Sequence, residues 1–210
     1  MSDEKYDQLR SVAGPVSRET YERLLTFESE FRRWSQRINL AAPSTIDTLW
    51  RRHIIDSAQL LAIESGPATW LDLGSGGGFP GAVLAILFAG QPGASVTLVE
   101  SNRKKAAFLQ SVLGQMRVPV AVLPVRIEDA PAAISQADIV TARALAPLND
   151  LLRLSEPWLT RGARGLFHKG REYRTEVEKC HDAWQFDLVE HPSLIDGDGA
   201  ILEITNLSPR

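Results

Sequence analysis

"WLDLGSGGGFPG", residues 70–81, is an apolar strand pattern with one acid, Asp72, that runs directly into a glycine-rich loop. Five glycines fall within the eight positions 74–81. Glycine permits positive φ angles and lets the backbone approach a ligand closely. In an open α/β sheet, the first strand–loop–helix turn is the usual place for a ligand. The stretch therefore predicts the first strand of such a sheet, followed by a ligand-binding loop.

Strand and helix patterns alternate after this stretch. We expect strands at residues 69–73, 95–100, 119–125, 137–143 and 165–170, and helices at 80–90, 102–116, 130–135, 148–159 and 172–183. Two last strand patterns, 184–192 and 200–207, are joined through "DGDG" and predict an antiparallel pair. The chain is predicted to form an α/β, Rossmann-like fold with a mostly parallel sheet and an antiparallel C-terminal edge.

The residues before this α/β pattern are predicted to be helical. Residues 16–40 have apolar side chains at helical spacing after a plausible start at Ser17, and a second helix is expected at about 47–64. We therefore expect an N-terminal helical extension, residues 1–66, attached to a main domain, residues 67–210.

Composition narrows the class of protein. Hydrophobic residues make up 44% of the chain and charged residues 23%, values typical of soluble globular proteins. Cys180 is the only cysteine, so an internal disulfide and a cysteine-rich zinc module are excluded, and no metal is expected. The sequence shows neither a signal-peptide pattern nor an apolar run of membrane-spanning length, which predicts a cytoplasmic protein without membrane contact.

Basic residues gather in two places although the net charge is −3. Residues 31–53 and 161–174 are each rich in arginine, lysine and histidine against a single acid. Such clusters on an acidic protein suit a polyanionic partner bound at one face. Ordinary solvated arginines would give the same pattern, so the charge leaves both interpretations open.

The glycine loop fits two patterns. Gly76, Gly78 and Gly81 match the G-x-G-x-x-G of dinucleotide-binding enzymes. Gly74, Gly76 and Gly78, with Asp72 before them, match the start of S-adenosylmethionine-dependent methyltransferases. A carboxylate at Asp72 would repel a pyrophosphate but attract the positively charged amino-acid part of S-adenosylmethionine. The acid therefore favours the second pattern.

Residues beyond the glycines are consistent with a nucleoside site. Phe79-Pro80 removes one N–H from the expected phosphate cradle, which again favours S-adenosylmethionine. Glu100 ends the second strand, where a carboxylate accepts hydrogen bonds from ribose hydroxyls in both enzyme classes. Ile127 offers an apolar wall, and Glu128 a polar neighbour, for an adenine ring.

Five motifs together carry a more specific resemblance. They are "RRHIIDS" (51–57), "DLGSGGGFPG" (72–81), "RIED" (126–129), "TARALAPLND" (141–150) and "FHKG" (167–170). In this order the chain, from about Glu30 to Leu207, resembles the bacterial ribosomal RNA small subunit methyltransferase G family, also called glucose-inhibited division protein B. The resemblance implies a class I methyltransferase fold. It also implies N7-methylation of one guanine in 16S rRNA, with S-adenosylmethionine as donor and S-adenosylhomocysteine as product.

The resemblance also implies roles for individual residues. Cofactor contacts would fall on Gly74, Phe79, Ile127, Glu128 and Arg143, with Glu100 on the ribose. The pattern of the loop adds Asp72, Gly76 and Gly78 to this set. Two positions depart from the family's habit: Thr141 stands where many members carry serine, and Ala41 stands where a hydroxyl residue is usual, which puts any role of that hydroxyl in doubt.

The acceptor side is expected to use Arg143, His53 and Asp56 as catalytic residues and Arg52, Lys169 and Arg171 as RNA contacts. Arg143 would donate to guanine O6 or to phosphate. The structural alternative for Arg143 is an ion pair with a carboxylate such as Glu128. His53 and Asp56 would share a helix face and either position the target or form a structural hydrogen bond. Lys169 would contact phosphate or be a solvated strand end.

Guanine N7 carries a lone pair and no proton, so its methylation requires alignment rather than a general base. The expected partner is 16S rRNA, a small ribosomal subunit or an assembly intermediate, and a monomer is expected. Three rival hypotheses stay open: a nicotinamide-dependent oxidoreductase, a non-catalytic RNA-binding assembly factor on the same fold, and a methyltransferase acting on protein or a small molecule.

Overall fold

The computed structural model describes residues 2–210, and its centre is a seven-stranded sheet in the order β3-β2-β1-β4-β5-β7-β6. The strands are β1 (Thr69–Leu73), β2 (Ser95–Val99), β3 (Ala121–Leu123), β4 (Ile139–Arg143), β5 (Arg164–Lys169), β6 (Trp184–Pro192) and β7 (Ala200–Pro209). Strands β1 to β5 are parallel, and only β7 runs against them, inserted between β5 and β6. Strand order reverses at β1, so a ligand is expected at the carboxyl ends of β1, β2 and β4.

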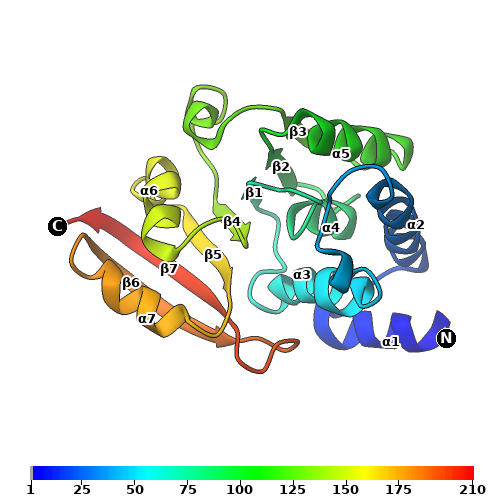
Figure 1. Ribbon diagram of the computed structural model, residues 1–210, viewed down its shortest axis with the longest axis horizontal. Coiled ribbons are helices and arrows are strands. Elements are labelled where there is room, and N and C mark those ends of the chain that lie inside the picture. The colour runs from blue at the N-terminus through cyan, green and yellow to red at the C-terminus, as the bar shows by residue number, and fades with distance from the viewer. Residues whose placement is uncertain (1) are drawn as a thin grey trace.

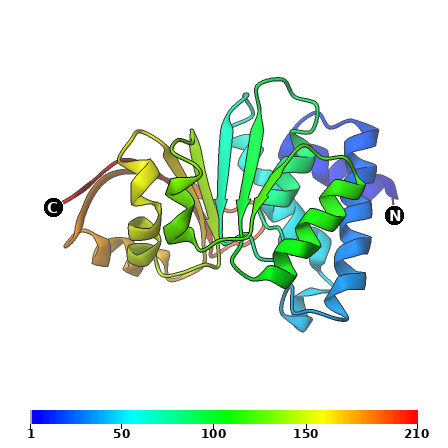
Figure 2. The same cartoon turned by 90° about the horizontal axis from the view of Figure 1, so that it is seen from above.

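Helices cover both faces of the sheet (Figures 1 and 2). One face carries α1 (Ser2–Ala13), α2 (Arg18–Ser35), α3 (Asp56–Ala58), α4 (Gly81–Leu87) and α5 (Arg103–Gln115), and the other carries α6 (Leu148–Leu159) and α7 (Tyr173–Cys180). Successive strand residues point to opposite faces: Trp70 packs with the first layer and Leu71 with the second. Both faces are buried, which explains why the parallel strands read as continuous apolar runs.

The alternation of strands and helices and the C-terminal antiparallel pair confirm the predicted fold class. Two predicted helix starts are also confirmed: Ser17 Oγ accepts from Thr20 N at 3.0 Å, and Asn102 Oδ1 accepts from Lys104 N at 3.0 Å. The helix α1 lies within the predicted helical extension, but no separate helix was predicted at its position. Among its residues with described side chains only Leu9 and Ala13 are buried, so its sequence lacks a strong apolar periodicity.

The predictions of one regular α-helix over 47–64 and another over 130–135 were wrong. The first is a chain of short helical turns, η2 (Trp50–Ile55), α3 and η3 (Gln59–Ala62), preceded by η1 (Pro43–Thr45). Turns of η2 are wide, because the Asp56 N–H bonds to the carbonyl of Arg51, five residues back. The second is a 3₁₀ segment, η4 (Ile127–Ala132), containing Pro131, which has no N–H to donate.

The core of the first layer continues from α2 into the glycine loop. Phe31 of α2 is fully buried, and its ring centroid lies 5.2 Å from that of Phe79 and 5.9 Å from that of Phe108. A Cβ on Gly77 would lie 2.7 Å from Phe31 Cε2 and 2.9 Å from the carbonyl oxygen of Leu40. Glycine is needed there because the segment before residue 66 packs directly against the loop.

Candidate active site

The loop after β1 forms one wall of a cavity of about 560 Å³, which we call the loop cavity. It lies at the carboxyl ends of β1, β2 and β4, as the reversal of strand order predicts. Its wall includes Gly74, Ser75, Gly76, Gly77, Phe79, Glu100, Ile127, Glu128, Arg143 and Leu145. Of the cofactor contacts expected from the sequence, all but Asp72 and Gly78 line this cavity.

The backbone of the loop follows a path that glycine permits. Gly74, Gly76 and Gly78 have φ of 66°, 56° and 96°, in the region that side chains with a Cβ rarely adopt. A Cβ on Gly74 would also lie 2.6 Å from Cδ1 of Leu145. Gly74 and Gly76 therefore leave backbone, rather than side chains, facing the cavity.

Glu100 holds the loop at the end of β2. Its Oε2 accepts from Gly76 N and its Oε1 from Asn102 N, both at 2.7 Å, and the side chain is nearly buried. Each oxygen keeps a second lone pair. The carboxylate lines the loop cavity, so it can accept further hydrogen bonds from the hydroxyl groups of a ligand.

Asp72 lies beneath the loop and does not line the loop cavity. Its carboxylate accepts from Thr141 Oγ1 at 2.8 Å and from Gly81 N at 3.2 Å. The predicted direct contact of Asp72 with a charged ligand does not agree with this burial. Gly78 also lies off the cavity wall, since a Cβ there would meet Ala82 Cβ at 2.7 Å. Both residues instead hold the loop on the side that faces away from the cavity.

We expect the unfolding free energy to depend on pH because of the buried Asp72 carboxyl. Burial raises the pKa of Asp72 from its usual 3.8 to about 6. Its contribution to stability is therefore fully present below pH 4 and lost as pH rises through about 6. Relative to Asp72→Asn, which cannot titrate, the wild type should gain up to roughly 3 kcal/mol between pH 7 and pH 4.

Urea unfolding of both proteins across this pH range measures the difference. The buried histidines titrate in both proteins, so their contributions cancel in the comparison. A difference that stays constant from pH 4 to pH 7 would contradict the raised pKa.

A second cavity, of about 660 Å³, adjoins the first, and we call it the arginine cavity. Arg51, Arg52, His53, Asp56, Arg143, His168 and Lys169 line it, together with part of the β6–β7 loop, residues 193–199. His53 and Arg143 belong to the walls of both cavities. These two side chains therefore stand at the junction between the two spaces.

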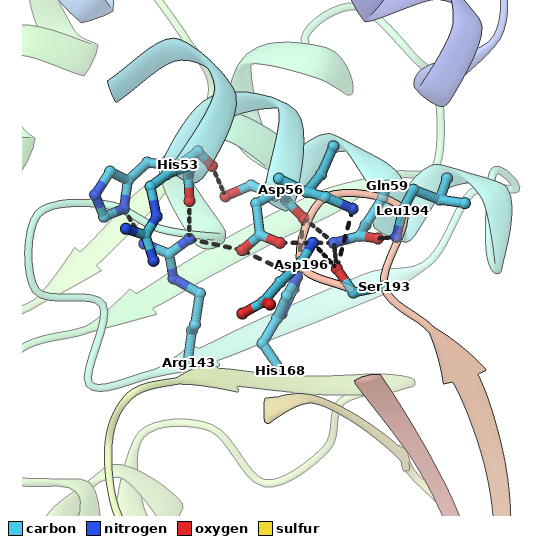
Figure 3. Close-up of polar contacts among 11 residues, drawn as sticks. His53, Asp56, Gln59, Arg143, His168, Ser193, Leu194 and Asp196 are labelled. Atoms are coloured by element: carbon cyan, nitrogen blue, oxygen red, sulfur yellow. Dashed lines mark hydrogen bonds and ion pairs between the residues drawn. The ribbon is translucent and has the colours of Figure 1, made fainter. Parts of the chain in front are cut away.

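Arg143, the last residue of β4, is the centre of a polar cluster (Figure 3). Its Nη1 donates to Asp56 Oδ2 at 2.8 Å and to the carbonyl oxygen of Arg52 at 3.0 Å, and its Nη2 contacts His53 Nδ1. In an α-helix the Arg52 carbonyl would accept from the Asp56 N–H. In η2 that N–H bonds to the Arg51 carbonyl instead, so the Arg52 carbonyl is left to accept from Arg143. Arg143 thus pairs with Asp56, not with Glu128.

His53 is held in one neutral form. Burial and the nearby Arg143 guanidinium lower the pKa of His53 to about 4. Nδ1 accepts from Arg143, so the proton of the neutral ring resides on Nε2. Within residues 2–210 this buried Nε2 has no hydrogen-bond partner. The ring lies on Phe79, with centroids 4.9 Å apart, and its Nε2–H is enclosed rather than open to either cavity.

The three expected RNA contacts differ in position. Arg52 is exposed at the arginine cavity. Lys169 also lines it, but its side chain is only 8% exposed, and Nζ lies 2.5 Å from Glu176 and donates to a backbone carbonyl. Arg171 lies outside both cavities with its side chain 77% exposed, 3.6 Å from Asp198. Of the three, only Arg52 offers an exposed cation at the site.

Several other residues of the basic clusters are paired locally. Arg32 bonds to Glu28 at 2.9 Å, Arg33 contacts Glu30, and Arg164 lies 3.0 Å from Glu64. For these arginines the interpretation as ordinary surface pairs holds. The basic character of the site itself comes from η2, where Arg51 and Arg52 are adjacent.

Sequence reasoning missed His168, Gln59 and the β6–β7 loop. His168 stood in the quoted motif "FHKG" and, like Arg143, near a strand end, which was the available signal. Its Nε2 contacts the Asp56 carbonyl at 2.9 Å, and burial lowers its pKa. Gln59 follows Asp56 by three residues, a spacing that places both on one helix face. The loop was predicted only as the connection between the last two strands, and nothing in the sequence indicated that it lines the site.

Two searches of residues 2–210 concern other kinds of site. No group of three or more histidine, cysteine, aspartate or glutamate residues in this range could hold a metal ion. None of the helices formed by these residues has the length and apolar character required to cross a membrane. Cys180 is buried at the end of α7, where burial raises the pKa of its thiol to about 11.

Known proteins are similar to this chain in sequence and in fold. The family described as GidB, rRNA small subunit methyltransferase G, matches residues 20–202. Ribosomal RNA small subunit methyltransferase G of Chelativorans sp. (strain BNC1) is 58% identical over 207 residues, 99% of each chain. The protein of that name from Brucella anthropi is 52% identical over 206 residues, 98% of this chain and 97% of the relative.

Among solved structures, magnesium protoporphyrin IX methyltransferase from Synechocystis PCC 6803, with bound S-adenosylmethionine, is similar with a TM-score of 0.59. At 13% identity, over 91% of this chain and 99% of that one, it supports the fold alone. The sequence matches and the fold agree, and the chain belongs to the rRNA small subunit methyltransferase G family.

Proposed function

We propose that this protein transfers a methyl group from S-adenosylmethionine to N7 of one guanine in 16S rRNA. The observation that carries the proposal is the pair of adjoining cavities with Arg143 and His53 in the wall between them. A methyl transfer needs a donor and an acceptor in line across a short distance. Two spaces that meet at a polar junction provide such an arrangement.

The loop cavity suits the donor. Its volume of about 560 Å³ falls within the range of small-molecule sites. Glu100 is placed to accept from the ribose hydroxyls, the loop backbone around Gly74 and Gly76 to hold the amino-acid part, and Ile127 with Glu128 to flank the adenine. When bound, S-adenosylmethionine supplies a methyl group activated by its sulfonium. The side chains of this chain bind and orient it.

The arginine cavity suits the base. Guanine presents two acceptors, N7 and O6, on one edge, and the guanidinium of Arg143 supplies N–H donors in the wall of that space. Arg51 and Arg52 are placed to contact phosphates. The Asp56 carboxylate offsets the charge of Arg143 and favours the positive charge that moves onto the guanine during transfer. N7 needs no proton removed, which agrees with a neutral His53 held in place.

Its partner in this proposal is 16S rRNA, alone or in a small ribosomal subunit or assembly intermediate, and the protein acts in the cytoplasm as a monomer. In this proposal residues 2–66 form a layer that supports the glycine loop of the main domain, since Phe31 and the Leu40 carbonyl pack against Gly77. The dinucleotide alternative is disfavoured because residues 20–202 match an rRNA methyltransferase family.

Transfer of a labelled methyl group to 16S rRNA or to small-subunit particles, followed by mapping of the modified base, tests the proposal. We expect the label in a single guanine, at N7. Label in another base, in protein or nowhere would reject it. Affinity for a reduced nicotinamide dinucleotide, with none for S-adenosylmethionine, would instead support the oxidoreductase, while RNA binding without transfer would support the assembly factor.

A further inference from the structure

Gln59 is a fully enclosed polar side chain beside the proposed acceptor site, only 2% exposed. Its Nε2 donates to Asp56 Oδ1 at 2.7 Å and to the Asp56 carbonyl oxygen at 3.0 Å, and it makes a longer contact, 3.5 Å, with Ser193 Oγ. Its Oε1 accepts from the backbone N–H of Leu194 at 2.9 Å (Figure 3). The two ends of one amide therefore join the segment 50–62 to the β6–β7 loop.

The orientation of this amide follows from its neighbours. The backbone N–H of Leu194 can only donate, so the amide oxygen must face it. The carboxylate and carbonyl of Asp56 accept, so the amide nitrogen must face them. A glutamine meets both requirements at once, whereas a carboxylate or an apolar side chain in this place meets one or neither.

Contacts of Gln59 set the direction of the Asp56 carboxylate. With Oδ1 held by Gln59, Oδ2 is left to accept from Arg143 at 2.8 Å. Asp56 in turn holds the Arg143 guanidinium at the junction of the two cavities. The geometry at Arg143 therefore depends on an amide that does not itself line either cavity.

The other end of the amide positions the wall of the arginine cavity. Within the β6–β7 loop, Ser193 Oγ accepts from Ile195 N at 3.2 Å and Asp196 N at 3.0 Å, and Ser193 N donates to the Gly199 carbonyl at 3.0 Å. These bonds fix the shape of the loop. The Leu194 N–H bond to Gln59 fixes its place relative to Asp56.

We propose that Gln59 is a positioning residue that aligns the Asp56–Arg143 pair for methyl transfer and holds the β6–β7 loop as the RNA-side wall of the same cavity. This inference rests on the proposed function. It assigns the two tasks to opposite ends of one side chain, so each end can be disturbed separately.

Gln59→Glu and Ser193→Ala separate the two ends. Glutamate keeps an acceptor for the Leu194 N–H but sets an oxygen against Asp56, so we expect kcat to fall by at least about 10-fold with KM for RNA near the wild-type value. Ser193→Ala removes the bonds that shape the loop and the long 3.5 Å contact with Gln59 Nε2, while both bonds of Gln59 to Asp56 remain, so we expect KM for RNA to rise about 3-fold or more with kcat unchanged. Affinity for S-adenosylmethionine should stay within about 2-fold in both.

Two further variants complete the design. Gln59→Met, similar in volume and without polar atoms, should lower kcat and raise KM together, and it replaces Gln59→Glu if that variant does not fold. Gln91→Ala is the matched control, since the Gln91 amide donates to the Ser65 carbonyl at 3.1 Å, outside both cavities, and should leave all constants unchanged.

Wild-type kcat in both Gln59 variants would overturn the inference, as would a fall in donor affinity that matches the fall in kcat, because that marks a general structural role. An unchanged KM in Ser193→Ala would remove the loop from the RNA side. Failure of the proposed function looks different: the wild type itself would then transfer no methyl group to 16S rRNA.

Discussion

Replacing Arg143 by alanine is expected to lower methyl transfer to 16S rRNA by at least about 10²-fold while the protein stays folded. The guanidinium stands in the wall of both cavities and is held there by Asp56, His53 and the carbonyl of Arg52. Alanine removes the donors and leaves the Asp56 charge near the junction without its partner. Arg143→Lys should restore only part of the rate, because an ammonium lacks the planar fork of donors.

Single-turnover transfer with saturating donor and RNA measures this effect directly, and circular dichroism checks the fold. Arg153→Ala is the matched control: that side chain is 70% exposed on α6 and pairs with neighbouring Asp150 at 3.3 Å. Full activity in Arg143→Ala would remove Arg143 from the site and with it the role proposed for Asp56.

Glu100→Gln is expected to weaken binding of S-adenosylmethionine by about 10- to 100-fold. The two carboxylate oxygens accept from Gly76 N and Asn102 N. A glutamine has only one acceptor oxygen, so one of these backbone groups loses its partner and faces an N–H donor instead. The loop then shifts away from β2, and the proposed bond to a ribose hydroxyl is lost at the same time.

Isothermal titration of the donor into wild type and variant gives the two affinities. Glu178→Gln, an exposed change on α7 outside both cavities, provides the control for the loss of one negative charge. An affinity within 2-fold of the wild type would show that the Glu100 carboxylate neither holds the loop nor contacts the donor.

The fold was predictable because its signals are local. Each strand of the parallel sheet is an apolar run between turn residues, and the glycines after Leu73 mark the ligand loop. Arg143, His53 and Asp56 were assigned to one site, although no contact between them was predicted. That assignment relied on the resemblance, since 87 positions separate Arg143 from Asp56.

The burial of Asp72 and the partner of Arg143 were not predictable from the same local signals. The sequence places Asp72 near the end of β1, but its burial depends on how closely the start of α4 packs over it, where a Cβ on Gly81 would lie 2.5 Å from the Asp72 carboxylate. The partner of Arg143 depends on η2, whose wide turns free the Arg52 carbonyl. Periodicity in sequence does not distinguish such turns from an ordinary helix.

The bond between Gln59 and Leu194 also has a consequence for the order in which the protein is made. It spans 135 positions, so a ribosome must synthesise β1 to β6 after Gln59 before its partner exists. Contacts of such long sequence separation form late in folding. During synthesis the wall on the RNA side can close only after the segment that follows β6 has been made, and the same hairpin, β6–β7, completes the second core layer. The acceptor side of the site is therefore the part whose residues are supplied last.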